Sequence, residues 1–219
     1  AGYPSGLVDR GPAIDPGAFS QDFLQRIVIP PHAFLTNSAQ INNDTLSVTI
    51  CLDFQLPVNN TYKLACVLVE DSVTGTGPQY YQANYYSGGS SLVDVDGSDW
   101  NAKPSNVPDY LMIYRHVARA ISPSFLGDAL PQNSYGFGDT ESINFSFNID
   151  PSWDLSKIRI VGMLMDQSGM VDNASSSTIT EAENNNITGL CSNSTTPMSW
   201  NCVAGACVDL GTGLGIYSS

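Results

Sequence analysis

Apolar residues alternate with polar ones in several short runs, and this period of two is the feature that most limits the fold. In Leu46–Phe54, an aliphatic or aromatic residue occupies every second position. Successive side chains of a strand point to opposite faces, so this run predicts a strand with one buried face. Ile143–Ile149 alternates in the same way, and the nearly continuous apolar run Ile158–Asp166 is typical of a strand buried on both faces.

Clusters of Asn, Gly, Pro and Asp separate these predicted strands, as in proteins made mainly of β-structure. We therefore predict that residues 33–183 form one antiparallel β-sandwich, Ig-like or jelly-roll-like. Tyr110–Ala120 fits both a helical and a strand pattern, and we favour a strand because helical patterns are otherwise absent from this region. Residues 184–219 begin with an Asn/Ser/Thr-rich stretch and predict a linker followed by a cysteine-containing tail.

Two cysteines fall on neighbouring predicted strands. Tyr62–Glu70 is a second apolar run, and the loop 57–60 before it predicts a hairpin that places Cys51 opposite Cys66. Opposed cysteines at a non-hydrogen-bonded pair can form a disulfide; the alternative is two small apolar residues packed in a sheet. The five cysteines are an odd number, so at least one is a free thiol or pairs outside this sequence. The disulfide candidates are Cys51, Cys66, Cys191, Cys202 and Cys207.

Residues 1–32 predict a short strand, Tyr3–Asp9, followed by a helix. Pro16 suits a first helical turn, and Pro30 and Pro31 end the helix. No basic segment with an apolar run follows Ala1, so we expect that a leader, or more than a leader, has been removed. We expect the first ten residues to pair with backbone outside residues 11–30, with a neighbouring molecule as the preferred partner.

The charge balance excludes several classes of protein. Eight Lys and Arg against 21 Asp and Glu give a net charge of −13, which repels nucleic acids. No apolar stretch is long enough to span a membrane. Few lysines and many Asn, Ser, Thr, Gly and Tyr residues predict a secreted protein rather than a cytosolic one. Sparse lysine also leaves sheet edges poorly protected, so a homo-oligomer or fibre is an alternative that the negative charge opposes.

Five segments, in order, are similar to the outer membrane protein 28-related family, whose members are secreted or surface proteins of Bacteroidota. Together they span most of residues 1–183, and the resemblance implies an extracellular or outer-membrane surface location. The segments are Gly2–Arg10, Tyr62–Asp71, Asn84–Gly89, Tyr114–Ala120 and Val161–Asp166.

The resemblance implies a thioredoxin-like part followed by a β-sandwich. Residues 1–32 would then be the end of a thioredoxin-like domain, and Pro4 would correspond to its cis-proline; the alternative is a free arm packed on the sandwich. Trp200–Ser219 resembles a cysteine-containing repeat that continues with further cysteines, which would supply a partner beyond Ser219. Proteins of this kind commonly use type IX secretion.

No complete catalytic set is visible. His32 and His116 stand without a Gly-x-Ser-x-Gly motif, so we interpret both as structural or surface histidines. Acidic residues are scattered, and no pair is spaced for glycoside hydrolysis. No Cys-x-x-Cys motif or zinc-ligand spacing is present.

Two loop regions are candidates for binding. Asp94, Asp96 and Asp99 could supply oxygen ligands to Ca²⁺, although a solvated acidic loop is the alternative. Four tyrosines in the same region, if exposed, would suit stacking on sugars or a protein partner; if buried, they would cap the sandwich. They are Tyr80, Tyr81, Tyr85 and Tyr86.

Thr45 and Ser72 follow aspartates and precede apolar residues, a pattern that resembles the O-glycosylation motif of exported Bacteroidota proteins. We expect both to be solvent-exposed and at least one to carry a glycan.

These observations predict a non-enzymatic extracellular or cell-surface β-sandwich module for binding or assembly, with a partner protein, a glycan or its own copies. The alternative is a thiol-redox or thiol-binding protein whose active thioredoxin-like half lies upstream. A glycan hydrolase is a third hypothesis. Apart from Ca²⁺, the sequence implies no cofactor.

Overall fold

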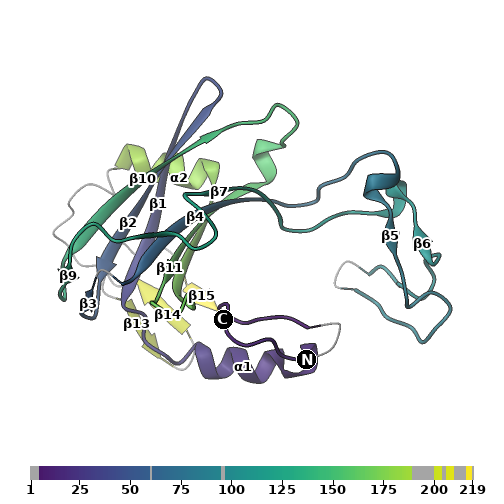
Figure 1. Ribbon diagram of the computed structural model, residues 1–219, viewed down its shortest axis with the longest axis horizontal. Helices are drawn as coiled ribbons and strands as arrows, with labels where there is room; N and C mark the ends of the chain where they lie inside the picture. The colour runs from purple at the N-terminus through teal and green to yellow at the C-terminus, as the bar shows by residue number, and fades with distance from the viewer. Residues whose placement is uncertain are drawn as a thin grey trace.

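Two antiparallel sheets form the main body of the protein (Figure 1). The computed structural model describes residues 5–59, 61–94, 97–188, 200–203, 206–209 and 216–218. The first sheet has the strand order β1-β2-β10, and the second has the order β12-β11-β4-β7, with the short β8 also paired to β4. The first comprises β1 (Ala33–Asn42), β2 (Thr45–Phe54) and β10 (Thr140–Asn148). The second comprises β4 (Lys63–Glu70), β7 (Val117–Ser122), β8 (Asp128–Ala129), β11 (Ile158–Met165) and β12 (Val171–Thr178).

The core lies between these sheets, and the alternation in the sequence explains it. On β2, every second residue from Leu46 to Phe54 is buried, while the residues between them are more exposed. On β4, Leu64, Cys66 and Leu68 face the same core, whereas Ala65 belongs to a smaller cluster on the other face of the sheet. The predicted β-sandwich and the predicted strands on β2, β10 and β11 are confirmed.

The predicted hairpin between β2 and β4 is wrong. Residues 55–62 connect the two sheets, and β3 (Val58–Asn59) pairs with β9 (Ser134–Tyr135) at the end of the sandwich. Pro57 has no amide proton to donate to a hairpin ladder. Val58 is buried instead, and the Tyr135 ring stacks on Phe54 at 4.2 Å between centroids. Burial of these side chains outweighs the local turn preference.

Cys51 and Cys66 therefore do not face each other. Cys51 lies opposite Thr36 and Ser142 in the first sheet, with its sulfur 3.5 Å from the Ser142 hydroxyl. Cys66 lies opposite Gly162 and Ser122 in the second sheet. Cys66 is a free, buried thiol, and burial raises its pKa to about 12. A thiol in this environment stays protonated and unreactive.

A helix closes one side of the sandwich. The helix α2 (Ile179–Thr188) packs against β1 and buries Ile179 and Ala182. Thr178 and Glu181 form a capping box: the Thr178 amide donates to the Glu181 carboxylate at 2.7 Å, and the Glu181 amide donates to the Thr178 hydroxyl at 3.2 Å. The linker predicted to begin at residue 184 thus starts inside α2, because this cap and the buried apolar residues outweigh the poor helix propensity of consecutive asparagines.

One buried asparagine joins the two sheets and the helix. The Asn37 side chain donates to the Ile160 carbonyl at 2.9 Å and to the Ser177 hydroxyl at 3.1 Å, and it accepts from the Ser175 hydroxyl. The Asn185 side chain donates to the Asn37 carbonyl at 2.8 Å. Gly162 makes room for this contact, since a Cβ there would lie 3.3 Å from Asn37 Oδ1 and 2.7 Å from Ile50 Cδ1.

The N-terminal segment contains the predicted helix, but residues 5–9, the described part of the predicted strand, form no continuous strand. The helix starts as η1 (Pro16–Ala18) and continues as α1 (Phe19–Arg26). In place of a strand, Gly6 forms an isolated bridge with Ile14, and Asp9 and Arg10 have positive φ angles of 49° and 59°. Tyr3 and Pro4 lie outside the described residues, so the cis-proline stays a prediction.

Contacts with β12 hold this segment against the sandwich. The Val171 amide donates to the Asp9 carbonyl at 2.8 Å, and Arg26 pairs with Asp9 at 2.9 Å while also donating to the Val171 carbonyl. The expectation that the first ten residues pair outside residues 11–30 is wrong for Gly6, whose bridge to Ile14 is local, but the Asp9 carbonyl does bond to β12. The assignment of residues 1–32 to a thioredoxin-like domain stays a prediction.

Several short elements complete the description. They are η2 (Pro78–Tyr80), β5 (Gln82–Ala83), β6 (Asn106–Val107), η3 (Asp109–Leu111) and η4 (Leu155–Lys157). The strand expected over 110–120 begins only at β7, because η3 and an isolated bridge at Tyr114 occupy the preceding residues. In the tail, β13 (Trp200–Val203), β14 (Ala206–Asp209) and β15 (Ile216–Ser218) form a three-stranded sheet.

Cys202 lies opposite Cys207 in the register of that tail sheet. Cys191 falls outside the described residues. Disulfides at these cysteines stay predictions. Within the described ranges, no helix is long and apolar enough to cross a membrane.

We expect Asn37→Ala to destabilise the sandwich by about 2–4 kcal/mol, because it removes buried hydrogen bonds to the Ile160 carbonyl and to the Ser175 and Ser177 hydroxyls and opens a cavity. Urea unfolding measures this change. The exposed Asn148→Ala on β10 is the matched control and should change stability by less than about 0.5 kcal/mol. Equal unfolding midpoints for the two variants would show that Asn37 does not join the sheets.

Candidate functional site

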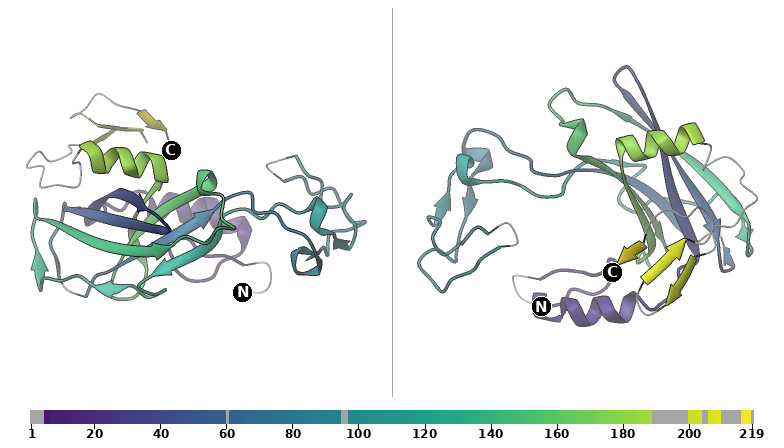
Figure 2. Two further views of the ribbon diagram at one scale, coloured as in Figure 1. Left: turned by 90° about the horizontal axis from the view of Figure 1, so that it is seen from above. Right: turned by 180° about the vertical axis from the view of Figure 1, so that it is seen from behind.

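A long excursion of the chain leaves the sandwich between β4 and β7. We call residues 74–113 the arm and residues 71–73 and 114–116 the neck. Figures 1 and 2 show the arm extending away from the two sheets, with β5 and β6 near its outer end. In β5 and β6, Gln82 pairs with Val107 and Ala83 pairs with Asn106. Loops that a rigid scaffold holds out in this way are common binding sites.

The neck is narrow and tightly bonded. Val73 and Tyr114 exchange both backbone hydrogen bonds, at 2.8 Å and 2.9 Å. On the sandwich side of this pair, Ser72 and His116 both have left-handed backbone conformations, with φ angles of 55° and 53°. Non-glycine residues adopt this conformation at a cost of roughly 1–3 kcal/mol each, so other contacts must hold them there.

Asp71 supplies those contacts. Its carboxylate accepts a hydrogen bond from the Ser72 hydroxyl at 3.2 Å and pairs with Arg115 at 2.7 Å. Loss of solvent acts to raise the pKa of Asp71, but the Ser72 amide, the Arg115 guanidinium and the other hydrogen bonds outweigh it. The pKa of Asp71 therefore lies below its ordinary value of 3.8.

The strand that leads into the neck is also fixed. Glu70, the last residue of β4, is buried and pairs with Arg119 of β7 at 2.7 Å. Its second carboxylate oxygen accepts from the Asp154 amide at 3.2 Å. Two consecutive acidic residues therefore have different roles. Glu70 joins β4 to β7, and Asp71 joins the two segments of the neck.

Inside the arm, one buried asparagine bonds several segments together. The Asn84 side chain donates to the Trp100 carbonyl at 2.7 Å and contacts the carbonyls of Lys103 and Pro104 at 3.3 Å. Its oxygen accepts from the Tyr86 amide at 3.0 Å. Asn84 therefore brings the tyrosine segment and the tryptophan loop together, although they are far apart in the sequence.

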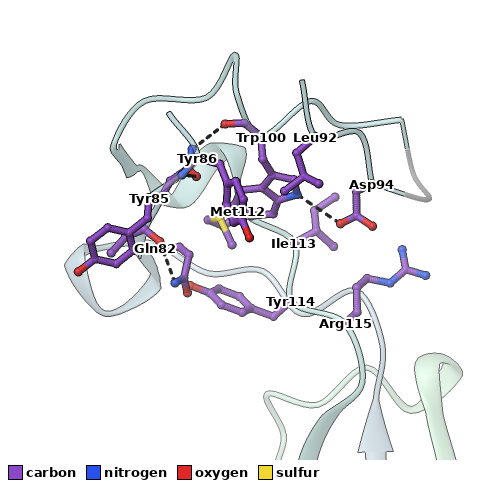
Figure 3. A pocket seen from close by; sticks show the side chains of 12 residues that line it. Gln82, Tyr85, Tyr86, Leu92, Asp94, Trp100, Met112, Ile113, Tyr114 and Arg115 are labelled. Atoms are coloured by element: carbon purple, nitrogen blue, oxygen red, sulfur yellow. Dashed lines mark hydrogen bonds between the residues drawn. The ribbon is translucent and has the colours of Figure 1, made fainter. Parts of the chain in front are cut away.

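A pocket of about 450 Å³ opens between these parts of the arm and the neck. Figure 3 shows Tyr86, Trp100 and Met112 gathered at its centre, Tyr85 at one end, and Asp94 and Arg115 at the other. The indole nitrogen of Trp100 donates to Asp94 at 3.4 Å, and the Lys103 ammonium lies 4.2 Å from the Trp100 ring centroid. The pocket is therefore mainly apolar, with four aromatic side chains among its lining residues and charged groups at one end.

The structure brings together only two of the four tyrosines predicted as a binding set. Tyr85 and Tyr86 line the pocket. Tyr80 packs beside Tyr114 and accepts the hydroxyl proton of Tyr114 on its carbonyl, whereas Tyr81 lies outside the pocket. None of the four caps the sandwich. Sequence reasoning missed Trp100 and Tyr114. Each is an aromatic residue next to a charged one, Asp99 and Arg115, and this is the available signal in the sequence. The sequence does not show that the fold brings them close to Tyr85.

The acidic loop has mixed roles. The Asp99 carboxylate accepts from the amides of Leu92 and Asn101, at 3.1 Å and 3.0 Å, and from the Ser91 hydroxyl, so it shapes its own loop. Asp94 holds the Trp100 indole, and Asp96 lies outside the described residues. Over the part of the chain that the structure describes, no three His, Cys, Asp or Glu side chains gather as metal ligands. Calcium binding stays a prediction.

The two histidines lie in structural positions. His32 Nδ1 lies 2.6 Å from the Asp172 carboxylate, and the His32 amide donates to the same side chain at 2.9 Å, which anchors the N-terminal segment to β12. His116 belongs to the neck, where its backbone is left-handed and its amide helps to lower the pKa of Asp71.

Thr45 and Ser72 are half-buried rather than fully exposed. Thr45 begins β2, and Ser72 belongs to the neck. Glycosylation of either residue stays a prediction. On Ser72, a glycan would remove the hydroxyl that donates to Asp71.

Residues 1–183 match the protein family described as outer membrane protein Omp28. The chain belongs to the Omp28 family. Its members are outer membrane proteins, and this places the chain at the outer-membrane surface, as the sequence predicted.

Two further comparisons add little. No curated protein matches the chain. One solved structure, the sporulation control protein Spo0M from Bacillus subtilis, is similar with a TM-score of 0.40 and 9% sequence identity. The match covers 69% of this chain and 49% of that one, so the chain spans about half its length. A likeness this weak supports no inference about function.

We expect the Asp71 carboxyl to titrate below 3.8 in a carbon-detected NMR titration of the folded protein. Because the pKa is lowered by folding, the ionised carboxylate stabilises the neck above the ordinary pKa, and this contribution disappears as the pH falls through the lowered value. Asp71→Asn should remove it at neutral pH and speed amide exchange at Ser72 and His116. Asp44→Asn, at an exposed turn, is the control. An Asp71 midpoint at or above 3.8 would disprove this role.

Proposed function

We propose that this Omp28-family protein is a non-enzymatic binding module of the outer-membrane surface, in which the sandwich is the scaffold and the arm binds the ligand. The observation that carries this proposal is the aromatic pocket on the arm. Concave, mainly apolar sites of roughly 300–1,000 Å³ with a few polar groups are the usual form of ligand sites, and this pocket has a volume of about 450 Å³.

Exposure of large side chains on the arm supports the proposal. Tyr85 is 97% exposed and Tyr86 is 49% exposed. Tyrosine and tryptophan are enriched where proteins bind partners, because they offer a large apolar surface and a polar tip. Clustering of such residues on a projecting segment indicates a surface that is built for contact.

The residues of the pocket favour binding over catalysis. Glycoside hydrolysis normally needs two carboxylates across the scissile bond, and among the described residues that line the pocket Asp94 is the one carboxylate. Thiol chemistry needs an accessible thiolate, whereas Cys66 is buried and its pKa is raised to about 12. The upstream thioredoxin-like alternative rests on residues outside this chain.

Removal of the arm tests the proposal. Val73 and Tyr114 exchange both backbone hydrogen bonds, which is the geometry that a two-residue turn connects. Replacing residues 74–113 with Asn-Gly should therefore leave the sandwich folded. We expect this armless variant to bind outer-membrane vesicles from the source bacterium at least about tenfold more weakly than the intact chain, because it lacks the aromatic contacts.

The control is Phe137→Ala, which removes an exposed aromatic residue from a loop of the sandwich. Fluorescently labelled protein and vesicle sedimentation measure the binding, and urea unfolding shows that each variant is folded. If the armless variant binds as well as the intact chain, or if the intact chain does not bind, the arm is not the binding surface. Binding to other copies of the chain would appear as arm-dependent association in light scattering.

A further inference from the structure

The centre of the arm pocket presents the Trp100 indole. Its nitrogen donates to Asp94 at 3.4 Å, and the Lys103 ammonium covers one face of its ring at 4.2 Å from the centroid, so a ligand can stack only on the other face. Figure 3 shows Tyr86 and Met112 beside Trp100, and Tyr85 standing free at one end. A sugar ring has an apolar face of C–H groups that stacks on an aromatic ring of this kind, at little entropic cost when the ring is already fixed.

The edges of the pocket offer hydrogen-bonding groups for the hydroxyls of a sugar. The Gln82 amide lies at one side, with its nitrogen donating to the Ala83 carbonyl at 3.1 Å and its oxygen able to accept. At the other end, Arg115 uses Nε to pair with Asp71, and Figure 3 shows its guanidinium directed toward Asp94. A carboxylate and a guanidinium together accept from and donate to neighbouring hydroxyls.

Charge separates neutral sugars from acidic ones. The chain has a net charge of −13, so a polyanion is repelled before it reaches the arm. Inside the pocket, Asp94 repels an acidic group, and Asp71 offsets the positive charge of Arg115. A neutral ligand avoids repulsion both by the net charge of the chain and by Asp94.

We propose that the arm pocket binds a short neutral oligosaccharide, with Trp100 and Tyr85 stacking on sugar rings and with Asp94 and Arg115 bonding to hydroxyls. This inference rests on the proposed binding function and names the ligand class of the same site. The volume of about 450 Å³ suits a few sugar units rather than a long chain. A folded protein partner would need a wider contact surface than this pocket offers.

Isothermal titration calorimetry with the full chain tests the inference. The probes are four neutral trisaccharides, namely maltotriose, cellotriose, mannotriose and xylotriose, and the acidic trigalacturonate. We expect at least one neutral trisaccharide to bind and trigalacturonate to bind at least tenfold more weakly. The inference is overturned if no neutral trisaccharide binds, or if trigalacturonate binds as tightly as the best of them.

Variants locate the binding. Tyr85→Ala removes a side chain that is 97% exposed, so it cannot unfold the arm, and Trp100→Phe keeps an aromatic ring but loses the bond to Asp94. Each should weaken binding of the neutral trisaccharide roughly tenfold. Tyr110→Ala, on the arm but outside the pocket, should leave it unchanged. Equal affinities for Tyr85→Ala, Trp100→Phe and Tyr110→Ala would overturn the site.

Treated vesicles separate failure of this inference from failure of the proposed function. Periodate destroys sugar rings with adjacent hydroxyls, and protease destroys surface proteins. Arm-dependent vesicle binding that is lost with periodate and kept after protease supports the saccharide. Arm-dependent binding that survives periodate and is lost with protease overturns the saccharide and leaves the binding module intact, with a protein as its partner.

Discussion

The Asp71 carboxylate at the neck is the interaction on which the position of the arm depends. It accepts a hydrogen bond from the Ser72 hydroxyl at 3.2 Å and pairs with Arg115 at 2.7 Å, and the Ser72 and His116 amides help to lower its pKa. These interactions offset the cost of two left-handed residues, Ser72 and His116, where the two segments of the neck leave the sandwich. Together with the backbone bonds between Val73 and Tyr114, they set the direction in which residues 74–113 leave the sheet.

The sandwich makes that position rigid. The strand β4 is buried on both faces, and its last residue, Glu70, pairs with Arg119 of β7 in a buried position. The two strands that lead to the arm are thus fixed by the core before Asp71 closes the neck. Arg115 belongs to both the neck and the pocket, so the same ion pair that orders the neck also places one of the polar groups of the site. Arg115 therefore contributes both to the structure of the neck and to the geometry of the pocket.

Much of the fold could be predicted from local patterns. Alternation identified β2 and β10, and a continuous apolar run identified β11, because these patterns follow directly from burial of one or two strand faces. Local patterns failed where distant contacts decide. The loop at Pro57 looks like a hairpin turn, but Val58 pairs with Tyr135 from a segment far along the chain. The helix α2 was missed, although Thr178 and Glu181 carry the capping-box signature.

The candidate site was predicted only in part for the same reason. Tyr85 and Tyr86 stand out as exposed aromatic residues in a loop, but Trp100 joins them only through the buried Asn84 side chain, which bonds to carbonyls of the tryptophan loop. An asparagine in a polar loop gives no sign of this role in the sequence. The pKa of Asp71 is likewise set by amides and a guanidinium that only the folded neck brings together.

Hydrogen–deuterium exchange of the intact protein, free and bound to outer-membrane vesicles, tests the central claim most directly. If the arm is the binding surface, protection on binding should be confined to the pocket segments around residues 82–86, 92–94 and 100, and the sheets should be unchanged. Protection along the outer strands β1 and β10 or β12 and β7, with none on the arm, would contradict the account, because binding would then use the edges of the sandwich.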